Sequence, residues 1–141
     1  MAKTSIKKHY YQEAWRKAIG KEMLNLIADK WTLVVMFALE GKGAVRFSDL
    51  HRFVGPVSQK MLSQTLRQLE KNGLVTRKVH PTVPPRVEYQ LTKLGESLGD
   101  ATCSIWVWVY KNGEKIEKAR GTFQTTRSSK GPAPWQTPVK A

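Results

Sequence analysis

Four long polar side chains fall on one narrow stripe of a helix that the sequence predicts over residues 58–72. Spacings of 4, 3 and 4 residues return to one face of a helix with about 3.6 residues per turn. The stripe carries Lys60, Gln64, Arg67 and Lys71. Such donors can reach base edges in the major groove of DNA, which admits one α-helix. The alternative is an ordinary solvated helix face.

The opposite stripe and the ends of this helix support the first interpretation. Leu62, Leu66 and Leu69 share the opposite face and predict that it packs on a core. Ser58 is expected to cap the first turn, whose free N–H groups can also meet a phosphate, and Gly73 to end the helix. Two more polar residues flank the stripe near its N-terminus, Gln59 and Ser63.

A basic β-hairpin is predicted directly after this helix, over residues 74–79 and 86–91. In the second strand, apolar Val87, Tyr89 and Leu91 alternate with polar residues, as in a half-buried strand. The linking loop HPTVPP is stiffened by three prolines. Around it cluster the basic residues Arg77, Lys78, His80 and Arg86. A rigid basic tip could follow the DNA backbone or enter the minor groove, unless its stiffness serves stability alone.

Three helices are predicted upstream, and they would position these side chains. The first covers residues 12–28 and is weakened at Gly20; the second, residues 30–39, is apolar on nearly every side and should be the buried centre. Asp29 and Ser48 are expected to cap the second helix and a short third helix, residues 47–53. Arg46 and Ser48 are the expected backbone contacts from this part. The predicted fold class is mainly α with a small β-hairpin (α+β): a winged helix-turn-helix.

A long helix is predicted over residues 92–119, with Thr92 as its cap. Leu94, Leu98, Ala101, Ile105 and Trp108 follow the spacing of a heptad seam. Trp106 and Val109 widen this apolar stripe, which exceeds what a small winged domain can cover and therefore predicts a partner. The alternative is that the helix folds back on its own domain.

The composition favours a nucleic-acid partner. The chain has 141 residues, with 24 basic residues against 11 acidic ones and a formal charge of +13. Such an excess attracts polyanions, with nucleic acid first and an anionic membrane surface second, although some basic proteins bind neither. We predict a flexible basic arm (residues 1–11), one domain (residues 12–120, with added helices at 12–28 and 92–119) and a disordered basic tail (residues 121–141).

Other classes of protein are disfavoured by what the sequence lacks. The N-terminus has no secretory signal pattern, and the longest apolar run, residues 33–39, cannot span a bilayer. A single cysteine, Cys103, fits a reducing cytoplasm, so we expect a cytoplasmic, nucleoid-associated protein. The three histidines lie on separate elements without metal-ligand spacing, and no phosphate-binding loop is present. We expect neither an enzyme nor a bound metal or cofactor.

Several runs together resemble the HxlR-type regulators of bacteria and archaea. The resemblance covers about residues 13–119 and is carried by LIADKWTLVVMFALEGKGAVRFSDLHR and VSQKMLSQTLRQLEKNGLVTRKVHPTVPPRVEYQLTKLGESL. It implies a homodimeric winged-helix transcription regulator that binds double-stranded DNA at a near-palindromic site. Its first and last helices would form the dimer interface, through Trp15, Ile19, Leu98, Ile105, Trp106, Trp108 and Val109.

One departure from the family concerns the switching signal. Many members carry a Cys-Pro pair in the first helix, and Ala18 and Ile19 stand at the matching positions here. Cys103 remains as a redox candidate, but a thiol in an apolar helix most often packs as a small hydrophobe. A small-molecule effector between the dimerisation helices, near Trp31, Trp106 or Trp108, is a further hypothesis, against the commoner role of such aromatics as core.

The second class of function kept open is a winged-helix module without promoter control. It would coat nucleic acid without regard to sequence, or bind RNA or a protein partner. Phosphate contacts alone can supply micromolar binding, so the basic charge fits this alternative as well.

Overall fold

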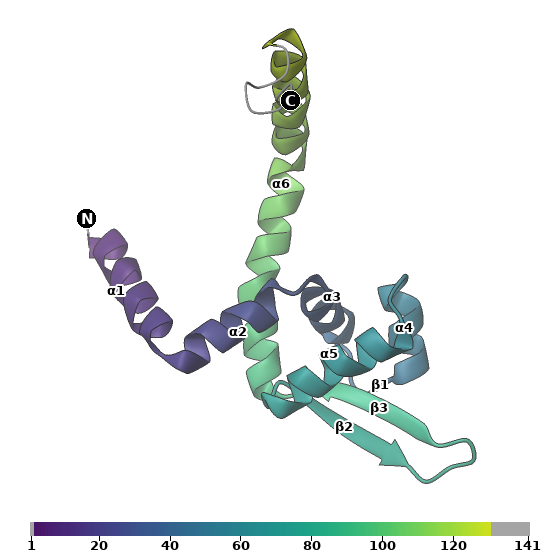
Figure 1. Cartoon of the computed structure of the whole chain (residues 1–141). Coiled ribbons are helices and arrows are strands. Elements are labelled where there is room, and N and C mark those ends of the chain that lie inside the picture. Colours follow the sequence, from purple (N-terminus) through teal and green to yellow (C-terminus); the bar gives the residue numbers. More distant parts are fainter. Residues whose placement is uncertain (1, 131–141) are drawn as a thin grey trace, which may run out of the picture. The chain divides into compact units, whose positions relative to one another are not determined.

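A computed structural model describes residues 2–130 of the chain, and the side-chain exposure of residues 7–126 (Figure 1). The elements are α1 (Ala2–Arg16), α2 (Ala18–Ala28), α3 (Lys30–Leu39), β1 (Val45–Arg46), α4 (Phe47–Val54), α5 (Gln59–Lys71), β2 (Val75–His80), β3 (Arg86–Leu91) and α6 (Lys93–Lys130). Contacts divide the chain into two compact units, with the boundary after Thr102. The predicted fold class is confirmed: helices α3 to α5 and a small antiparallel sheet make a winged helix.

The core of the first unit lies between α3, α4, α5 and the sheet. Asp29 caps α3 as predicted, since its carboxylate accepts a hydrogen bond from the backbone N–H of Thr32 at 2.9 Å. The largest fully buried apolar side chains are Val35, Met36, Leu39, Leu50, Leu62, Leu66 and Leu69. Helix α3 contacts α2, α4, α5 and β3, so it is the central element that the sequence predicted.

The turn between α4 and α5 is held by one glycine and one histidine. Gly55 has a φ of +87°, a conformation that residues with a Cβ rarely adopt. Nε2 of His51 lies 2.7 Å from the Val57 carbonyl oxygen and closes the turn. The prediction that Ser48 caps the short helix was wrong. Arg46 occupies that position without a side-chain cap, because the chain is still extended there as strand β1.

Both predicted ends of α5 are confirmed. The Ser58 hydroxyl accepts a hydrogen bond from the Met61 N–H at 3.1 Å. Gly73, with a φ of +70°, ends the helix in a Schellman pattern, in which Gly73 N–H donates to Glu70 O and Leu74 N–H to Leu69 O, each at 3.0 Å.

The sheet has the strand order β1–β3–β2, with antiparallel neighbours. Both hairpin strands occur where predicted, within a residue. Strand β1 was not predicted, because two residues are too few to show an alternating pattern. One row of paired residues across the sheet is Arg46, Glu88 and Lys78, and the next is Val45, Tyr89 and Arg77.

The N-terminal region differs from the prediction. Helix α1 covers residues 2–16 and so includes most of the flexible arm that was expected over residues 1–11; residues 2–16 contain no proline or glycine that would interrupt a helix. The helix expected over residues 12–28 is two helices, since Lys17 adopts an extended backbone conformation. A Cβ on Gly20 would overlap the carbonyl oxygen of Ala14, so this glycine permits close contact of α1 and α2.

Helix α6 also differs from the prediction, because it continues to Lys130 rather than ending near residue 119. No proline interrupts residues 121–130, which were expected to be disordered. Hydroxyls of Thr122 and Thr125 donate to backbone carbonyls one turn earlier, at 3.1 Å each, which reconciles these residues with a helix. The rest of the predicted tail, residues 131–141, lies outside the described residues.

The start of α6 supports a prediction about stability. Thr92 caps this helix as expected, accepting from the Gly95 N–H at 3.0 Å, and a Cβ on Gly95 would overlap the backbone carbonyl of Leu74. We expect Gly95→Ala to lower the free energy of unfolding by about 1–3 kcal/mol. In the control Gly113→Ala, on the same helix, a Cβ meets nothing within 4 Å, and we expect a gain of about 0.5–1 kcal/mol. Urea unfolding measures both; equal effects would contradict the close approach.

Candidate nucleic-acid interface

Helix α5 presents its polar stripe to solvent. Its apolar face is fully buried, since Leu62, Leu66 and Leu69 each have 0% of their surface exposed. All the polar residues predicted as contacts on this helix are exposed: Ser58, Gln59, Lys60, Ser63, Gln64, Arg67 and Lys71. Burial of the leucines therefore fixes the rotation of α5, and its donors face outward together.

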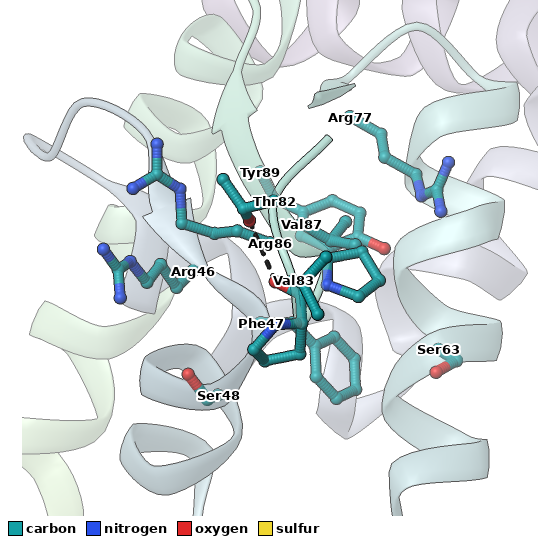
Figure 2. Close-up of a pocket in the computed structure, with 12 residues that line it drawn as sticks. Arg46, Phe47, Ser48, Ser63, Arg77, Thr82, Val83, Arg86, Val87 and Tyr89 are labelled. Atoms are coloured by element: carbon teal, nitrogen blue, oxygen red, sulfur yellow. Dashed lines mark hydrogen bonds between the residues drawn. The ribbon is translucent and has the colours of Figure 1, made fainter. Parts of the chain in front are cut away.

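A hollow of about 670 Å³ lies between α4, α5 and the wing, which we define as residues 75–91. Arginines from three strands, Arg46, Arg77 and Arg86, line it, together with the hydroxyl-bearing Ser48 and Ser63. Figure 2 shows the guanidinium groups of Arg46 and Arg86 on one side of this hollow and that of Arg77 on the other, next to α5. The hollow thus combines positive charge with hydroxyl groups, as a phosphate contact requires.

Two aromatic side chains line the hollow, and a hydrogen bond stabilises the loop beside it. Phe47 and Tyr89 have ring centroids 6.4 Å apart, and Phe47 also stacks on His51 at 6.2 Å. At the tip of the wing, the Thr82 hydroxyl donates to the Pro84 carbonyl at 2.9 Å (Figure 2). The proline-stiffened tip was predicted from the sequence, whereas Phe47 and the Thr82 hydroxyl were not identified as part of this site. The clustering of prolines and arginines was the available signal.

A second groove, of about 840 Å³, lies on the α2 side of α5. Its α5 rim carries Gln64, Arg67 and Lys71 of the polar stripe, and its α2 side carries Glu22 and Asn25. Arg67 also borders a smaller hollow with Ser63, Glu70, Arg77 and Tyr89 on the wing side. The guanidinium-bearing Arg67 therefore stands on the ridge between both sides of the helix.

The wing holds an acidic residue that the sequence analysis did not single out. Oε2 of Glu88 lies 2.8 Å from Nε2 of His80, and Oε1 lies 3.2 Å from Nε of Arg86. The hydrogen bond with His80 lowers the pKa of Glu88 below its ordinary value of 4.5; burial opposes this, and the charges of Arg86 and Arg46 add to it. The carboxylate is therefore ionised at neutral pH.

The predicted wing contacts are not all in one place. Arg46, Arg77 and Arg86 share the hollow with Ser48, whereas Lys78 and His80 are not among the residues that line it. Lys78 and His80 lie in the rows of Glu88 and Arg86 across the sheet. Of all the predicted contacts, the structure brings together Arg46, Arg77, Arg86, Ser48 and Ser63 in this hollow.

The predicted dimerisation residues are mostly exposed in the single chain. Trp15, Ile19, Ile105, Trp106, Trp108 and Val109 have between 41% and 58% of their surface exposed. Leu98 differs, because it packs against the core of its own unit. Cys103 is exposed rather than packed as a small hydrophobe, contrary to that expectation.

The described residues hold neither a cluster of metal ligands nor a membrane-spanning helix. Within residues 2–130, no group of three or more His, Cys, Asp or Glu side chains could hold a metal ion. Over the same part of the chain, no helix combines the length and apolar character needed to cross a membrane.

A family model and a curated relative identify the family of this chain. The family model described as HxlR-like helix-turn-helix matches residues 26–117. The chain is 41% identical over 101 residues to the HTH-type transcriptional regulator YtfH of Escherichia coli strain K12, an alignment covering 72% of this chain and 79% of that protein.

Solved structures show the same relationship. The transcriptional regulator YtfH of Salmonella typhimurium superposes with a TM-score of 0.68 at 39% identity, covering 72% of this chain and 89% of that one. The redox regulator HypR in its reduced form gives a TM-score of 0.64 at 32% identity, covering 70% and 96%.

The matched segment contains α3, α4, α5, the wing and the first part of α6, so the match includes every element that forms the arginine-lined hollow and the exposed polar stripe. This chain belongs to the HxlR-like family of winged helix-turn-helix, DNA-binding transcription regulators.

Proposed function

We propose that the chain is a sequence-specific transcription regulator that binds a near-palindromic operator as a homodimer. The observation that carries this proposal is the exposed stripe of Lys60, Gln64, Arg67 and Lys71 beside the arginine-lined hollow. In this function α5 enters the major groove, and its amide and guanidinium groups bond to base edges. Residues of the hollow and the wing contact the phosphate backbone of the DNA.

The two kinds of contact have separate roles. Phosphate contacts by Arg46 and Arg77 set the position of the domain and most of its affinity, and they are insensitive to sequence. Arg86, beside the tip of the wing, can instead enter the minor groove, where arginine responds to the sequence-dependent groove width. Base contacts from α5 supply discrimination. A module that merely coats DNA needs the first kind alone, so discrimination between sequences separates the two functions.

The dimer part of the proposal rests on exposed apolar surface. Ile105, Trp108 and Val109 on α6, with Trp15 and Ile19 near the N-terminus, expose 43–58% of their surface in one chain. A second copy would cover them and place two α5 helices in successive major grooves, one helical turn of DNA apart.

Arg67→Ala tests base recognition. A duplex selected by the wild-type protein from a random library is compared with a shuffled duplex of equal composition. We expect the variant to lose about 1–3 kcal/mol on the selected duplex and to relax the preference at one base position, because a bidentate contact to a base is lost. Fluorescence anisotropy titrations measure both affinities.

Lys7→Ala and Lys8→Ala are the controls, since both lysines are exposed on α1 and are not among the proposed base contacts. Where they contact phosphate, they should weaken all duplexes alike and lower the salt slope by about 0.9 per contact. Equal losses on the selected and shuffled duplexes for Arg67→Ala would refute sequence-specific regulation and favour coating.

Ile105→Asp tests the dimer. Burying an unpaired carboxylate in the interface should raise the dimer dissociation constant about a hundredfold, which sedimentation velocity detects as conversion to monomer. Tyr110→Asp is the matched control, because Tyr110 is 90% exposed and lies off the heptad-like stripe of α6. If both variants remain dimeric, or the wild type is a monomer, the proposed interface is wrong.

A further inference from the structure

Glu88 carries the only carboxylate between Glu70 and Glu96, a segment that contains five lysines and arginines. On a DNA-binding surface this charge is unfavourable, since it repels phosphates and weakens non-specific binding. The contacts of Glu88 in the structure indicate what benefit compensates for this repulsion.

The carboxylate lies at the centre of a group of cations from all three strands. Besides the contacts with His80 and Arg86, Arg46 on β1 and Lys78 on β2 lie opposite Glu88 in the register of the sheet. The side chains of Glu88 and His80 are only 16% and 21% exposed, so their positions are constrained, whereas that of Arg86 is 36% exposed.

The ion pair engages Arg86 through Nε. The contact is electrostatic, because Nε makes no hydrogen bond in the described part of the chain. No ion pair or hydrogen bond of the two terminal η nitrogens occurs there either, so both remain as donors at the hollow between α4, α5 and the wing. A guanidinium held from behind is preorganised: it does not lose side-chain freedom when it meets a phosphate or a base edge.

We propose that Glu88 is a positioning residue of the wing. Glu88 holds Arg86 and His80 in place for DNA, and it thereby lowers non-specific affinity while raising discrimination between DNA sequences. The inference rests on the proposed function and adds an acidic residue to its machinery. Glu88 does not itself touch DNA; it acts through Arg86. A carboxylate that only stabilises the hairpin would instead change folding and leave discrimination unaltered.

Glu88→Gln in the full-length chain tests this proposal with the selected and shuffled duplexes. We expect affinity for the shuffled duplex to stay the same or rise, because a repulsive charge is gone. The ratio of the two affinities should fall about tenfold, because Arg86 loses its charged partner. Glu88→Asp keeps the charge but shortens the side chain by one methylene, so the ratio should fall without a gain on the shuffled duplex.

Glu70→Gln is the matched control. Glu70 is exposed on α5 beside Arg67 and Arg77, and no ion pair of its carboxylate occurs in the described part of the chain. Removing its charge should raise affinity for both duplexes by the same factor. If Glu88→Gln behaves in the same way, Glu88 is only a local charge and the proposal is overturned.

A double-mutant cycle with Arg86→Ala shows whether Glu88 acts through this residue. In the Arg86→Ala background, Glu88→Gln should leave the ratio unchanged; an equal fall in both backgrounds overturns the proposal.

If circular dichroism shows that Glu88→Gln does not fold, the variant Arg86→Lys decides, because it keeps the positive charge and lacks Nε. It should lower the ratio, and an unchanged ratio refutes positioning. A wild-type protein that does not discriminate the duplexes refutes the proposed function, and this inference with it.

Discussion

The orientation of α5 depends on burial of its leucine face. Leu62, Leu66 and Leu69 have no exposed surface, so the helix cannot rotate without moving apolar side chains into water, at about 1.5–3 kcal/mol for each leucine. Because a helix has a fixed angular repeat, this same packing turns Lys60, Gln64, Arg67 and Lys71 outward together. The core therefore determines which side chains can meet a ligand, and the caps at Ser58 and Gly73 set where that surface begins and ends.

The wing follows a different principle, because its basic side chains are ordered by charge rather than by burial. Arginines and lysines on a solvated hairpin would repel one another and sample many conformations. Glu88 reduces this repulsion and gathers His80 and Arg86 at contact distance. The hydrogen bond of the Thr82 hydroxyl and the three prolines limit the conformations of the loop at the tip. Together, packing on α5 and charge pairing on the wing give two rigid surfaces on either side of one hollow.

The helices of the winged domain could be predicted because their signals are local: Asp29, Ser58 and Gly73 mark ends, and the leucine spacing marks a face. The hollow and the Glu88 contacts could not, because they join residues from β1, β2 and β3 whose register no sequence pattern fixes. Strand β1 was missed because of its length. The terminal helices were underestimated because runs of polar residues suggested disorder. No proline interrupts residues 2–16 or 121–130, and the hydroxyls of Thr122 and Thr125 bond to carbonyls of their own helix.

The chain's strong positive charge explains why affinity for DNA and discrimination between DNA sequences need separate residues. With a formal charge of +13, non-specific attraction to DNA is abundant, and a regulator gains nothing from more of it, because genomic DNA competes as an excess of weak sites. Under those conditions an acidic side chain on the wing is favourable when it raises the ratio of specific to non-specific binding, even while it lowers both. Glu88 has the geometry for that role because its carboxylate lies against both His80 and Arg86 and can hold their side chains in position.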